Sequence, residues 1–241
     1  MRLMHLLDLT LPTVAANLAL DEALLMAAEE HAGGEVLRFW HWSEPAVVLG
    51  AGGKIDDDVD VLACTNDGVP LARRSSGGGT VLLGRGCLLF TLVLEISRVP
   101  QLQQIRSSYR WILDRIATML SPLQPGIEFA GISDLAVAGR KFSGNAQQRK
   151  RRFILHHGTL LCDFDLSGVG RYLKLPPRRP DYRGERDHAE FLINLPNQPN
   201  AIRECLQTGW KAQEPSASWP QDQVTKLVEE KYNRKEWIMR R

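Results

Sequence analysis

Three consecutive glycines set the strongest constraint on how this chain can fold. Gly77, Gly78 and Gly79 follow Arg-Arg-Ser-Ser, and apolar segments typical of β-strands flank them at 68–74 and 80–83. Because glycine has no Cβ, the backbone here can adopt positive φ and approach a flat or anionic ligand closely. We therefore expect either a hairpin turn or a loop that closes over a ligand. The residues that follow match neither a Walker A motif nor the glycine motif that opens a dinucleotide-binding helix.

The segments around the glycines predict a mixed α+β fold. Residues 13–30 are rich in alanine, leucine and glutamate, which favours a helix. Apolar residues recur three and four positions apart from Leu102 to Leu120, which predicts a second helix with one apolar face. β-branched and aromatic runs predict strands at 36–42, 46–50, 68–74, 80–83, 87–95, 134–142 and 154–164. We expect the first two strands to be adjacent and the last two to form a long hairpin.

The composition is that of a globular protein. The chain has 241 residues, of which 44% are hydrophobic and 24% are charged, and its formal charge of +2 does not indicate a nucleic-acid partner. No apolar run reaches the roughly 18 residues of a membrane span, and the start lacks a secretory pattern, so we expect no membrane partner and a cytoplasmic location. The four cysteines are widely spaced without a C-x-x-C pair, which favours reduced thiols over disulfides or a zinc ribbon.

Lys141 is a candidate for holding an anionic or polarised group. It lies on the strand predicted at 134–142, just before a small polar turn. A partly buried lysine at such a position can donate to a phosphate or a carbonyl, whereas the alternative is a solvated strand lysine. Asp134 precedes it by seven residues, and an odd separation in a regular strand places the two side chains on opposite faces unless the strand bends or ends between them.

His156 and His157 are adjacent on the strand predicted at 154–164. Strand alternation sends them to opposite faces, so at most one points into a given cavity and they make a poor metal pair. A packed or hydrogen-bonded imidazole is the alternative for either. The basic run 149–152 could contact an acidic partner or form a solvated hairpin tip. The prolines and charges of 176–186 predict an irregular, exposed segment.

Three segments carry a resemblance to a known family. RRSSGGGTV, DLAVAGRKFSGNAQ and HHGTLL, in this order and spacing, resemble the catalytic domain of the lipoate-protein ligase and octanoyltransferase family, relatives of biotin protein ligase. LALDEALL, PAVVLG and EKYNRKEW add weaker support, so the resemblance spans nearly the whole chain. It implies a mixed, largely antiparallel β-sheet flanked by helices over residues 1–212. It further implies that 213–241 is a C-terminal helical extension packed on the same domain, without a separate accessory domain.

The resemblance implies an ATP-dependent acyl transfer in two steps. The carboxylate of lipoate or octanoate attacks the α-phosphate of ATP in the presence of Mg²⁺, and a lysine of a lipoyl-domain or glycine-cleavage H-like acceptor then attacks the acyl-adenylate. Some members of such a family need an accessory chain. Lys141 is the implied catalytic residue, and Asp134 is a candidate Mg²⁺ contact without a protein metal cluster. The implied substrate-binding residues are Arg73, Arg74, Ser76, Gly77, Gly78, Gly79, Thr80, His157, Gly158 and Thr159, and the implied nucleotide-binding residues are Asp134 and the turn residues Gly144, Asn145 and Ala146.

Two departures from the family pattern leave the reaction open. Many ligases follow the glycines with His-Asp-x-Gly-Asn, whereas Leu82 to Cys87 here reads LLGRGC. The octanoyltransferases carry a nucleophilic cysteine beyond the histidine strand or shortly before the lysine strand, where this chain has none, although Cys87 and Cys162 stay candidates. Three hypotheses follow: an ATP-using lipoate-protein ligase, an ATP-independent octanoyl or lipoyl transferase that uses a carrier protein, and a catalytically silent acyl- or adenylate-binding module.

Overall fold

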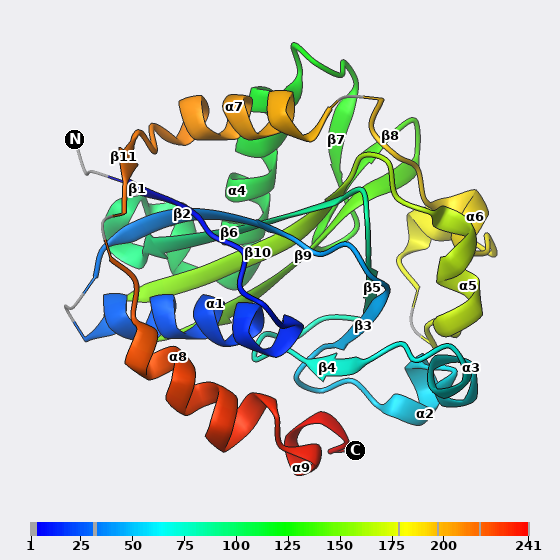
Figure 1. Ribbon diagram of the computed structural model, residues 1–241. Coiled ribbons are helices and arrows are strands. Elements are labelled where there is room, and N and C mark those ends of the chain that lie inside the picture. Colours follow the sequence, from blue (N-terminus) through cyan, green and yellow to red (C-terminus); the bar gives the residue numbers. More distant parts are fainter. Residues whose placement is uncertain (1–3, 31–32, 178, 197, 217, 241) are drawn as a thin grey trace.

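Strands build two sheets in the part of the chain that the structure describes (Figure 1). The computed structural model covers residues 4–30, 33–177, 179–196, 198–216 and 218–240. The strands of the large sheet are β1 (Met4–Asp8), β2 (Glu35–His41), β6 (Cys87–Glu95), β7 (Ile127–Ala130), β8 (Asp134–Val137), β9 (Arg140–Arg149), β10 (Phe153–Leu161) and β11 (Glu214–Pro215). The strands of the small sheet are β3 (Ala46–Leu49), β4 (Leu71–Arg73) and β5 (Val81–Leu83).

The pairing of these strands confirms the predicted α+β class. The large sheet has the order β11-β1-β2-β6-β10-β9-β8-β7, and the small sheet has the order β4-β3-β5. β1 pairs in parallel with β2 and β11, and the remaining pairs of the large sheet are antiparallel. The sheet is therefore mixed and largely antiparallel. The expectation that the strands at 36–42 and 46–50 are neighbours was wrong, because β2 and β3 belong to different sheets.

Helices cover both faces of the large sheet (Figure 1). The longer helices are α1 (Val14–Glu29), α4 (Ile105–Leu120), α7 (Pro199–Trp210) and α8 (Gln221–Leu227), the last continuing as the π-helical turn η5 (Val228–Tyr232). The shorter helices are α2 (Ile55–Asp58), α3 (Val61–Asn66), α5 (Val169–Tyr172), α6 (His188–Phe191) and α9 (Lys235–Ile238). The 3₁₀ turns are η1 (Ile96–Arg98), η2 (Pro100–Gln103), η3 (Leu166–Gly168) and η4 (Asp181–Arg183).

Alternation along the strands divides the core into two layers. On β2, Val36 and Trp40 pack in the layer that contains α1, whereas Leu37 and Phe39 pack in the layer that contains α4 and α7. Successive strand residues point to opposite faces, so both faces of this sheet must be apolar and both must be covered. The long apolar runs of the sequence follow from this requirement.

The two predicted long helices are confirmed, with one correction. The Thr13 hydroxyl accepts a hydrogen bond from the Ala16 amide at 3.1 Å and caps α1. α4 buries Ile112 and Ile116 as its periodicity predicts. The predicted apolar face began at Leu102, however, whereas in the structure Leu102 lies in η2, before the helix, and Ile105 is 59% exposed at the first position of α4.

The strand predicted at 134–142 is in fact a hairpin. β8 and β9 are joined by a turn in which Ala138 and Gly139 both have positive φ, 49° and 70°. β9 then continues to Arg149, so Gly144, Asn145 and Ala146 lie within a strand rather than in the expected turn. The long hairpin with β10 is confirmed, and its tip falls at residues 150–152.

The glycine segment is a loop and not a hairpin turn. Residues 74–80 connect β4 to β5, which lie on opposite sides of β3, so the loop crosses the end of that strand. The loop packs tightly on Gly50, where an added Cβ would lie 2.1 Å from the carbonyl oxygen of Gly78. Gly78 itself has a φ of +85°, which favours glycine.

The C-terminal helices pack on the same body as the sheets. α8 and η5 lie along α1, and α9 lies beside β4 (Figure 1). Among the residues described, no helix combines the length and the apolar character that crossing a bilayer requires.

Candidate active site

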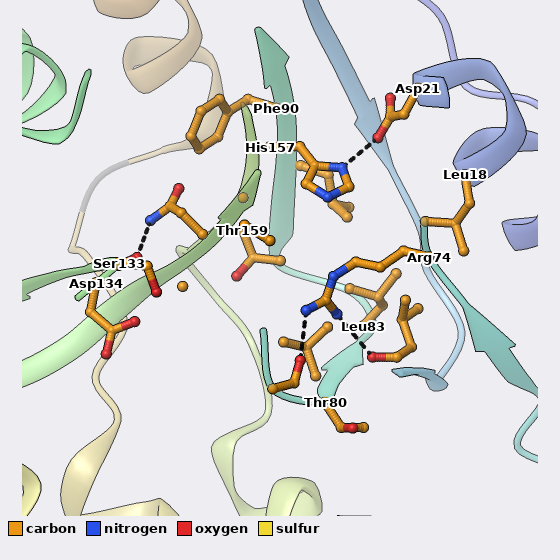
Figure 2. Close-up of a pocket in the computed structure, with 18 of the residues that line it drawn as sticks. Leu18, Asp21, Arg74, Thr80, Leu83, Phe90, Ser133, Asp134, His157 and Thr159 are labelled. Atoms are coloured by element: carbon orange, nitrogen blue, oxygen red, sulfur yellow. Dashed lines mark hydrogen bonds and ion pairs between the residues drawn. The ribbon is translucent and has the colours of Figure 1, made fainter. Parts of the chain in front are cut away.

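Two neighbouring cavities share part of their wall and form the candidate site, and Figure 2 shows residues that line the inner one. The inner cavity lies between α1, the small sheet and strands β9 and β10, and its apolar wall includes Leu18, Trp40, Val48, Leu83, Leu89 and Phe90. The outer cavity lies between the small sheet, the start of β9 and the described residues of 173–192, which include η4 and α6. The residues common to both walls include Gly79, Thr80, Asp134, Lys141, Gly144 and Thr159.

Lys141 stands where the two cavities meet. Its Nζ forms an ion pair with Asp134 Oδ1 at 2.8 Å, and the Tyr182 hydroxyl donates a hydrogen bond to Asp134 Oδ2 at 2.7 Å. The Lys141 side chain is 25% exposed and the Asp134 side chain is 11% exposed. Gly144 leaves the space for this ammonium group, because a Cβ there would lie 2.8 Å from Nζ. The lysine is thus held toward the cavities rather than toward bulk solvent.

The strand ends between Asp134 and Lys141, so the opposite faces expected for a regular strand do not apply. The two residues belong to the facing strands β8 and β9, and the register shifts between Leu135 and Ala136. Because of the turn and this irregularity, the alternation of side chains within one regular strand does not apply between these two residues. The turn and the irregularity bring both charged groups to the same side of the sheet.

Arg74 organises the glycine loop from within. Its guanidinium is 7% exposed and donates hydrogen bonds to the carbonyl oxygens of Gly77 (2.6 Å) and Gly79 (2.7 Å). It also donates to Ser76 Oγ at 3.1 Å and to Val48 O at 3.3 Å. Burial lowers the pKa of Arg74 to about 10, so the side chain stays charged at neutral pH. Arg74 lines the inner cavity, but these hydrogen bonds hold the loop.

Arg73 points away from both cavities. Its fully buried guanidinium donates to the carbonyl oxygens of Gly50 and Gly53 and to those of Ile238 and Arg240 in the C-terminal segment, at 2.8–2.9 Å. Successive residues at the end of β4 thus serve opposite sides of the chain. The expected substrate contact does not fit this placement, and Arg73 instead ties the C-terminal segment to the loop that precedes α2.

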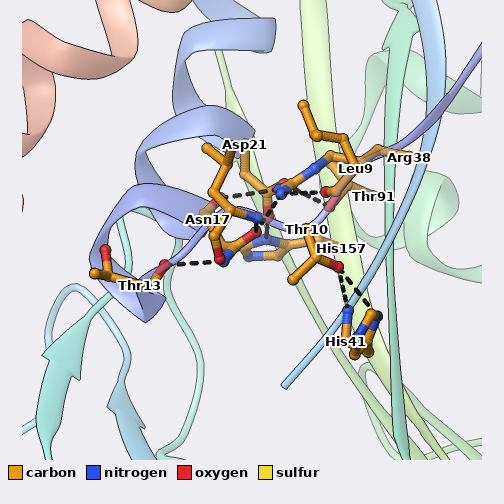
Figure 3. A network of polar contacts seen from close by, with 10 residues as sticks. Leu9, Thr10, Thr13, Asn17, Asp21, Arg38, His41, Thr91 and His157 are labelled. Atoms are coloured by element: carbon orange, nitrogen blue, oxygen red, sulfur yellow. Dashed lines mark hydrogen bonds and ion pairs between the residues drawn. The ribbon is translucent and has the colours of Figure 1, made fainter. Parts of the chain in front are cut away.

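A chain of buried hydrogen bonds connects α1 to the glycine loop, and Figure 3 shows the part of it from α1 to His157. Asp21 Oδ2 lies 2.9 Å from His157 Nδ1, and His157 Nε2 lies 2.6 Å from Ser76 Oγ. A carboxylate only accepts, so Nδ1 carries a proton, and Nε2 is the ring atom that faces the Ser76 hydroxyl. The order of groups is that of a Ser-His-Asp triad. Ser76, however, is 1% exposed and lies behind the cavity wall, which makes the chain a support for the loop.

Asp21 is held as a carboxylate despite its burial. Desolvation opposes ionisation, but the ion pair with Arg38 at 2.6 Å and hydrogen bonds from His157 and Thr91 keep the pKa of Asp21 below its ordinary value. Arg38 is in turn bonded to Asn17 Oδ1 at 2.6 Å. This network fixes the position of His157 at the inner cavity (Figures 2 and 3).

The two histidines lie on opposite faces, as predicted. His157 lines the inner cavity, whereas His156 is fully buried among the rings of Phe90 and Tyr109 on the α4 side. His156 Nδ1 lies 3.1 Å from Gln147 Nε2. Burial lowers the pKa of His156 to about 3, so the imidazole is neutral. His156 is therefore a core residue.

The remaining predicted residues divide into two groups. Gly158, Thr159, Asn145 and Ala146 line the inner cavity beside Lys141. Gly158 leaves room for the Asn145 side chain, since an added Cβ would lie 2.0 Å from Asn145 Oδ1. Arg73, Ser76, Gly77 and Gly78 do not line either cavity and act, if at all, through the loop.

No cysteine lines either cavity in the part of the chain that the structure describes. Cys87 and Cys162 are both buried. Burial and the nearby Asp163 raise the pKa of Cys162 to about 11, and burial raises that of Cys87 still further. Thiols in this state are poor nucleophiles.

Among the described residues, no cluster of three or more histidine, cysteine or acidic side chains is arranged to hold a metal ion. The Asp134 carboxylate is already engaged by Lys141 and Tyr182. The outer cavity also has Asp58, whose Oδ2 accepts a hydrogen bond from Thr80 at 2.7 Å. Mg²⁺ characteristically binds through one or two carboxylates together with substrate phosphates, so these residues suit a cation that arrives with a nucleotide.

Sequence reasoning missed Asp21, Tyr182 and Arg183. Asp21 was part of the supporting segment LALDEALL, and an acidic residue inside a helix of buried residues was its available signal. Tyr182 and Arg183 fall in a segment expected to be irregular and exposed, but Arg183 is 4% exposed and both residues line the outer cavity. No local pattern distinguishes these two residues from their exposed neighbours.

Comparison with known proteins supports the resemblance. Octanoyltransferase LipM from Carboxydothermus hydrogenoformans is 28% identical over 257 residues, covering 94% of each chain, and LipM from Symbiobacterium thermophilum is 31% identical over 69% of this chain and 68% of its own. A probable lipoate-protein ligase A from Mycoplasma pneumoniae is 27% identical over 74% of this chain, which spans about half (51%) of that relative's length.

Solved structures share the fold. A bipartite lipoate protein ligase from Thermoplasma acidophilum, described with its E2 lipoyl domain, has a TM-score of 0.84 at 23% identity, covering 99% of this chain and 97% of its own. A putative lipoate protein ligase from the same organism with bound lipoic acid, and a lipoate-protein ligase A bound with ATP, each have a TM-score of 0.82 at 23% identity and cover 99% of this chain. They cover 100% and 99% of their own chains.

The family match covers most of the candidate site. The lipoyl protein ligase A/B catalytic domain matches residues 13–204, which include both cavities' shared wall and Lys141. This chain is a member of the lipoyl protein ligase A/B catalytic domain family.

Proposed function

We propose that this protein is a lipoate-protein ligase that activates lipoate or octanoate with ATP and transfers the acyl group to a lysine of an acceptor lipoyl domain. One observation carries the proposal: an inner cavity with a wall of aliphatic and aromatic side chains meets, at Lys141, an outer cavity whose lining includes Arg179, Asp181 and Arg183. Among the described residues, no cysteine lines either cavity. Such a site suits an acyl chain inside and a nucleotide outside. The bound lipoic acid and ATP of two structural neighbours support the same substrate classes.

The reaction divides into two displacements at this junction. In the first, a carboxylate oxygen of the acid attacks the α-phosphorus of ATP and pyrophosphate leaves. In the second, the acceptor amine attacks the acyl carbon, AMP leaves and the amine proton passes to solvent. Lys141 stabilises the negative charge that develops on phosphate and acyl oxygens in both steps, because it is partly desolvated and fixed by Asp134.

Positioning accounts for most of the rate in this proposal. The loop held by Arg74 presents Gly79 and Thr80 to both cavities, so backbone and hydroxyl groups can contact the reacting centre. His157, Gly158, Asn145 and Ala146 line the inner, acyl side, and Asp134, Gly144 and Thr159 lie on the shared wall beside Lys141, where the acyl chain and the nucleotide would meet. Holding two substrates in reacting geometry can supply several kcal/mol of the barrier. Mg²⁺, which accompanies ATP, would be held by phosphates with Asp58 or Asp134 and would neutralise phosphate charge.

A transferase that takes octanoyl from a carrier protein is the second candidate. The names of relatives that match 94% of this chain favour it. That route usually forms a thioester on a cysteine, and Cys87 and Cys162 are buried with raised pKa values. The burial of both thiols is the reason why we prefer the ligase.

The test supplies the protein with ATP, Mg²⁺, lipoate or octanoate, and an acceptor lipoyl domain. We expect acid-dependent release of pyrophosphate and a gain in acceptor mass equal to one acyl group. Lys141→Ala should abolish both signals, whereas Lys54→Ala, which alters a 66% exposed lysine outside the cavities, should retain them.

The other hypotheses give different results in the same assay. Acceptor modification from octanoyl carrier protein without ATP, through a thioester that one cysteine substitution removes, would establish the transferase. Tight binding of acid or adenylate without any product would establish a silent binding module. Either result would refute the ligase.

A further inference from the structure

Arg183 is a buried cation in the wall of the outer cavity, and no described residue gives it a carboxylate partner. The residue is 4% exposed, and its Nε donates to the carbonyl oxygen of Arg186 at 3.0 Å. Its Nη2 is buried and has no hydrogen-bond partner, and its guanidinium lies 4.7 Å from the centre of the Phe191 ring. Asp187 acts on it only at longer range than an ion pair. A buried charge is costly unless it is paired, so this group calls for an anion.

The other buried guanidinium groups of the described chain show what compensation looks like here. Arg38 pairs with Asp21, and Arg73 and Arg74 each donate at least three hydrogen bonds to backbone oxygens. Arg183 has one such bond. Because Arg183 has fewer hydrogen bonds than the other three buried arginines, we expect its anionic partner to be a ligand rather than a residue of the chain.

The backbone around Arg183 is fixed before any ligand binds. Arg186 donates to the carbonyl oxygens of Arg183 (2.9 Å), Gly139 (3.0 Å) and Tyr182. These contacts tie the turn to the β8–β9 hairpin that holds Lys141, while Tyr182 is bonded to Asp134. Arg183 and Lys141 thus stand on one connected framework around the same cavity.

We propose that Arg183 binds the β- and γ-phosphates of the nucleotide substrate, the two phosphates that leave as pyrophosphate. The proposal rests on the proposed function, which puts the acid carboxylate and the α-phosphate at Lys141. Arg183 lines the outer cavity and not the inner one, so it meets the part of the ligand beyond the α-phosphate. A guanidinium presents a planar fork of donors that matches phosphate oxygens.

The same chemistry could come from another phosphate. The phosphodiester of a carrier protein's phosphopantetheine arm would also bring an anion into this cavity together with an acyl chain. The experiment therefore includes both sources.

The test measures dissociation constants by calorimetry for ATP, AMP and a non-hydrolysable acyl-sulfamoyl-adenosine, which lacks the β- and γ-phosphates. In Arg183→Gln we expect ATP to bind at least about tenfold more weakly, while the acyl-sulfamoyl-adenosine binds within about twofold of the wild type. Arg171→Gln is the matched control, because Arg171 is a 59% exposed arginine paired with Asp67 outside the cavities. It should bind all three ligands as the wild type does.

The outcomes separate this inference from the proposed function. Unchanged ATP binding in Arg183→Gln, or an equal loss for ATP and the acyl-sulfamoyl-adenosine, would overturn the phosphate contact while leaving the ligase intact. Failure of the wild type to bind either nucleotide would instead refute the ligase. In that case, the binding of octanoyl-phosphopantetheine decides. Weaker binding in Arg183→Gln would support a phosphate contact whose source is a carrier protein, and unchanged binding would refute the contact. Should Arg183→Gln not fold, the wild type alone decides, since equal affinities for ATP and AMP would contradict the proposal.

Discussion

Tyr182→Phe is the substitution that most directly examines how Lys141 is controlled. The Tyr182 hydroxyl donates to Asp134 Oδ2 at 2.7 Å, and Lys141 occupies Oδ1 at 2.8 Å. The phenol ring is held by Phe191, at 5.2 Å between ring centres, and by Gly131, where a Cβ would lie 3.2 Å from the ring. Removing only the hydroxyl should therefore leave the ring in place and take one partner from the carboxylate.

The magnitude follows from the burial of this carboxylate. A hydrogen bond to a charged group contributes about 1.5–3 kcal/mol, and the Asp134 side chain is only 11% exposed, so water replaces the lost donor poorly. An under-bonded carboxylate attracts the Lys141 ammonium more strongly and competes with substrate oxygens for it. If this energy opposes the transition state, kcat/KM for adenylate formation falls about tenfold to about a hundredfold.

The assay is acid-dependent pyrophosphate release, with urea unfolding of each variant as the measure of stability. Tyr172→Phe is the matched control, because Tyr172 donates to Asp67 at 2.9 Å in a pair outside both cavities. We expect Tyr172→Phe to retain wild-type kcat/KM. Wild-type kcat/KM in Tyr182→Phe, or the same loss in both variants, would refute the argument that Tyr182 acts through Asp134.

Three further predictions concern the core and the cavity wall. The folded-state pKa of His156 is about 3, against an ordinary value of 6.5, so between these pH values only the unfolded chain takes up a proton at this residue. The free energy of unfolding should therefore fall as the pH decreases from 6.5 to 3, by up to about 1.4 kcal/mol per pH unit. His156→Gln should flatten this pH dependence in urea unfolding. The double variant Cys87→Ala/Cys162→Ala should keep acyl transfer, and its loss together with a wild-type thioester would contradict the ligase. Gly158→Ala should destabilise the fold by about 1–3 kcal/mol and weaken the binding of lipoate or octanoate, because its Cβ would lie 2.0 Å from Asn145 Oδ1. Adding Asn145→Ser should relieve part of both effects, as measured by thermal unfolding and calorimetry.

Features set by neighbouring residues in the sequence were predictable. The capped helix α1, the hairpin of β9 and β10, and the opposite faces of His156 and His157 all follow from local periodicity. The presence of Lys141 in a cavity wall also agrees with its partly buried strand position. Local rules were sufficient wherever the chain kept one regular conformation.

Contacts between distant segments were not predictable in the same way. His157 and Asp21 are 136 positions apart, and Tyr182 and Asp134 are 48 apart, so no spacing rule joins them. The pairing of Asp134 with Lys141 was missed for a different reason, since the positive φ of Ala138 turned an assumed strand into a hairpin. A non-glycine residue in that conformation gives little warning in a sequence.

The segment from Leu82 to Cys87, in which this chain departs from many ligases, bears on which residues of the cavities would contact a nucleotide. Leu83 lines the inner cavity and Leu82 the outer one, so apolar side chains stand in the region that carries His-Asp in those ligases. Gly86 then turns at a φ of +83° against Asp163, where a Cβ would lie 2.1 Å from the backbone, so this part of the segment is held closely against residue 163. In the proposed ligase, other residues of the outer cavity would make the polar contacts with the nucleotide, and one of them is Arg183, whose guanidinium is buried and has no carboxylate partner among the described residues. If the protein is the proposed ligase, the departure after the glycines and the state of Arg183 have one explanation, in which Arg183 supplies phosphate contacts that the segment from Leu82 to Cys87 does not.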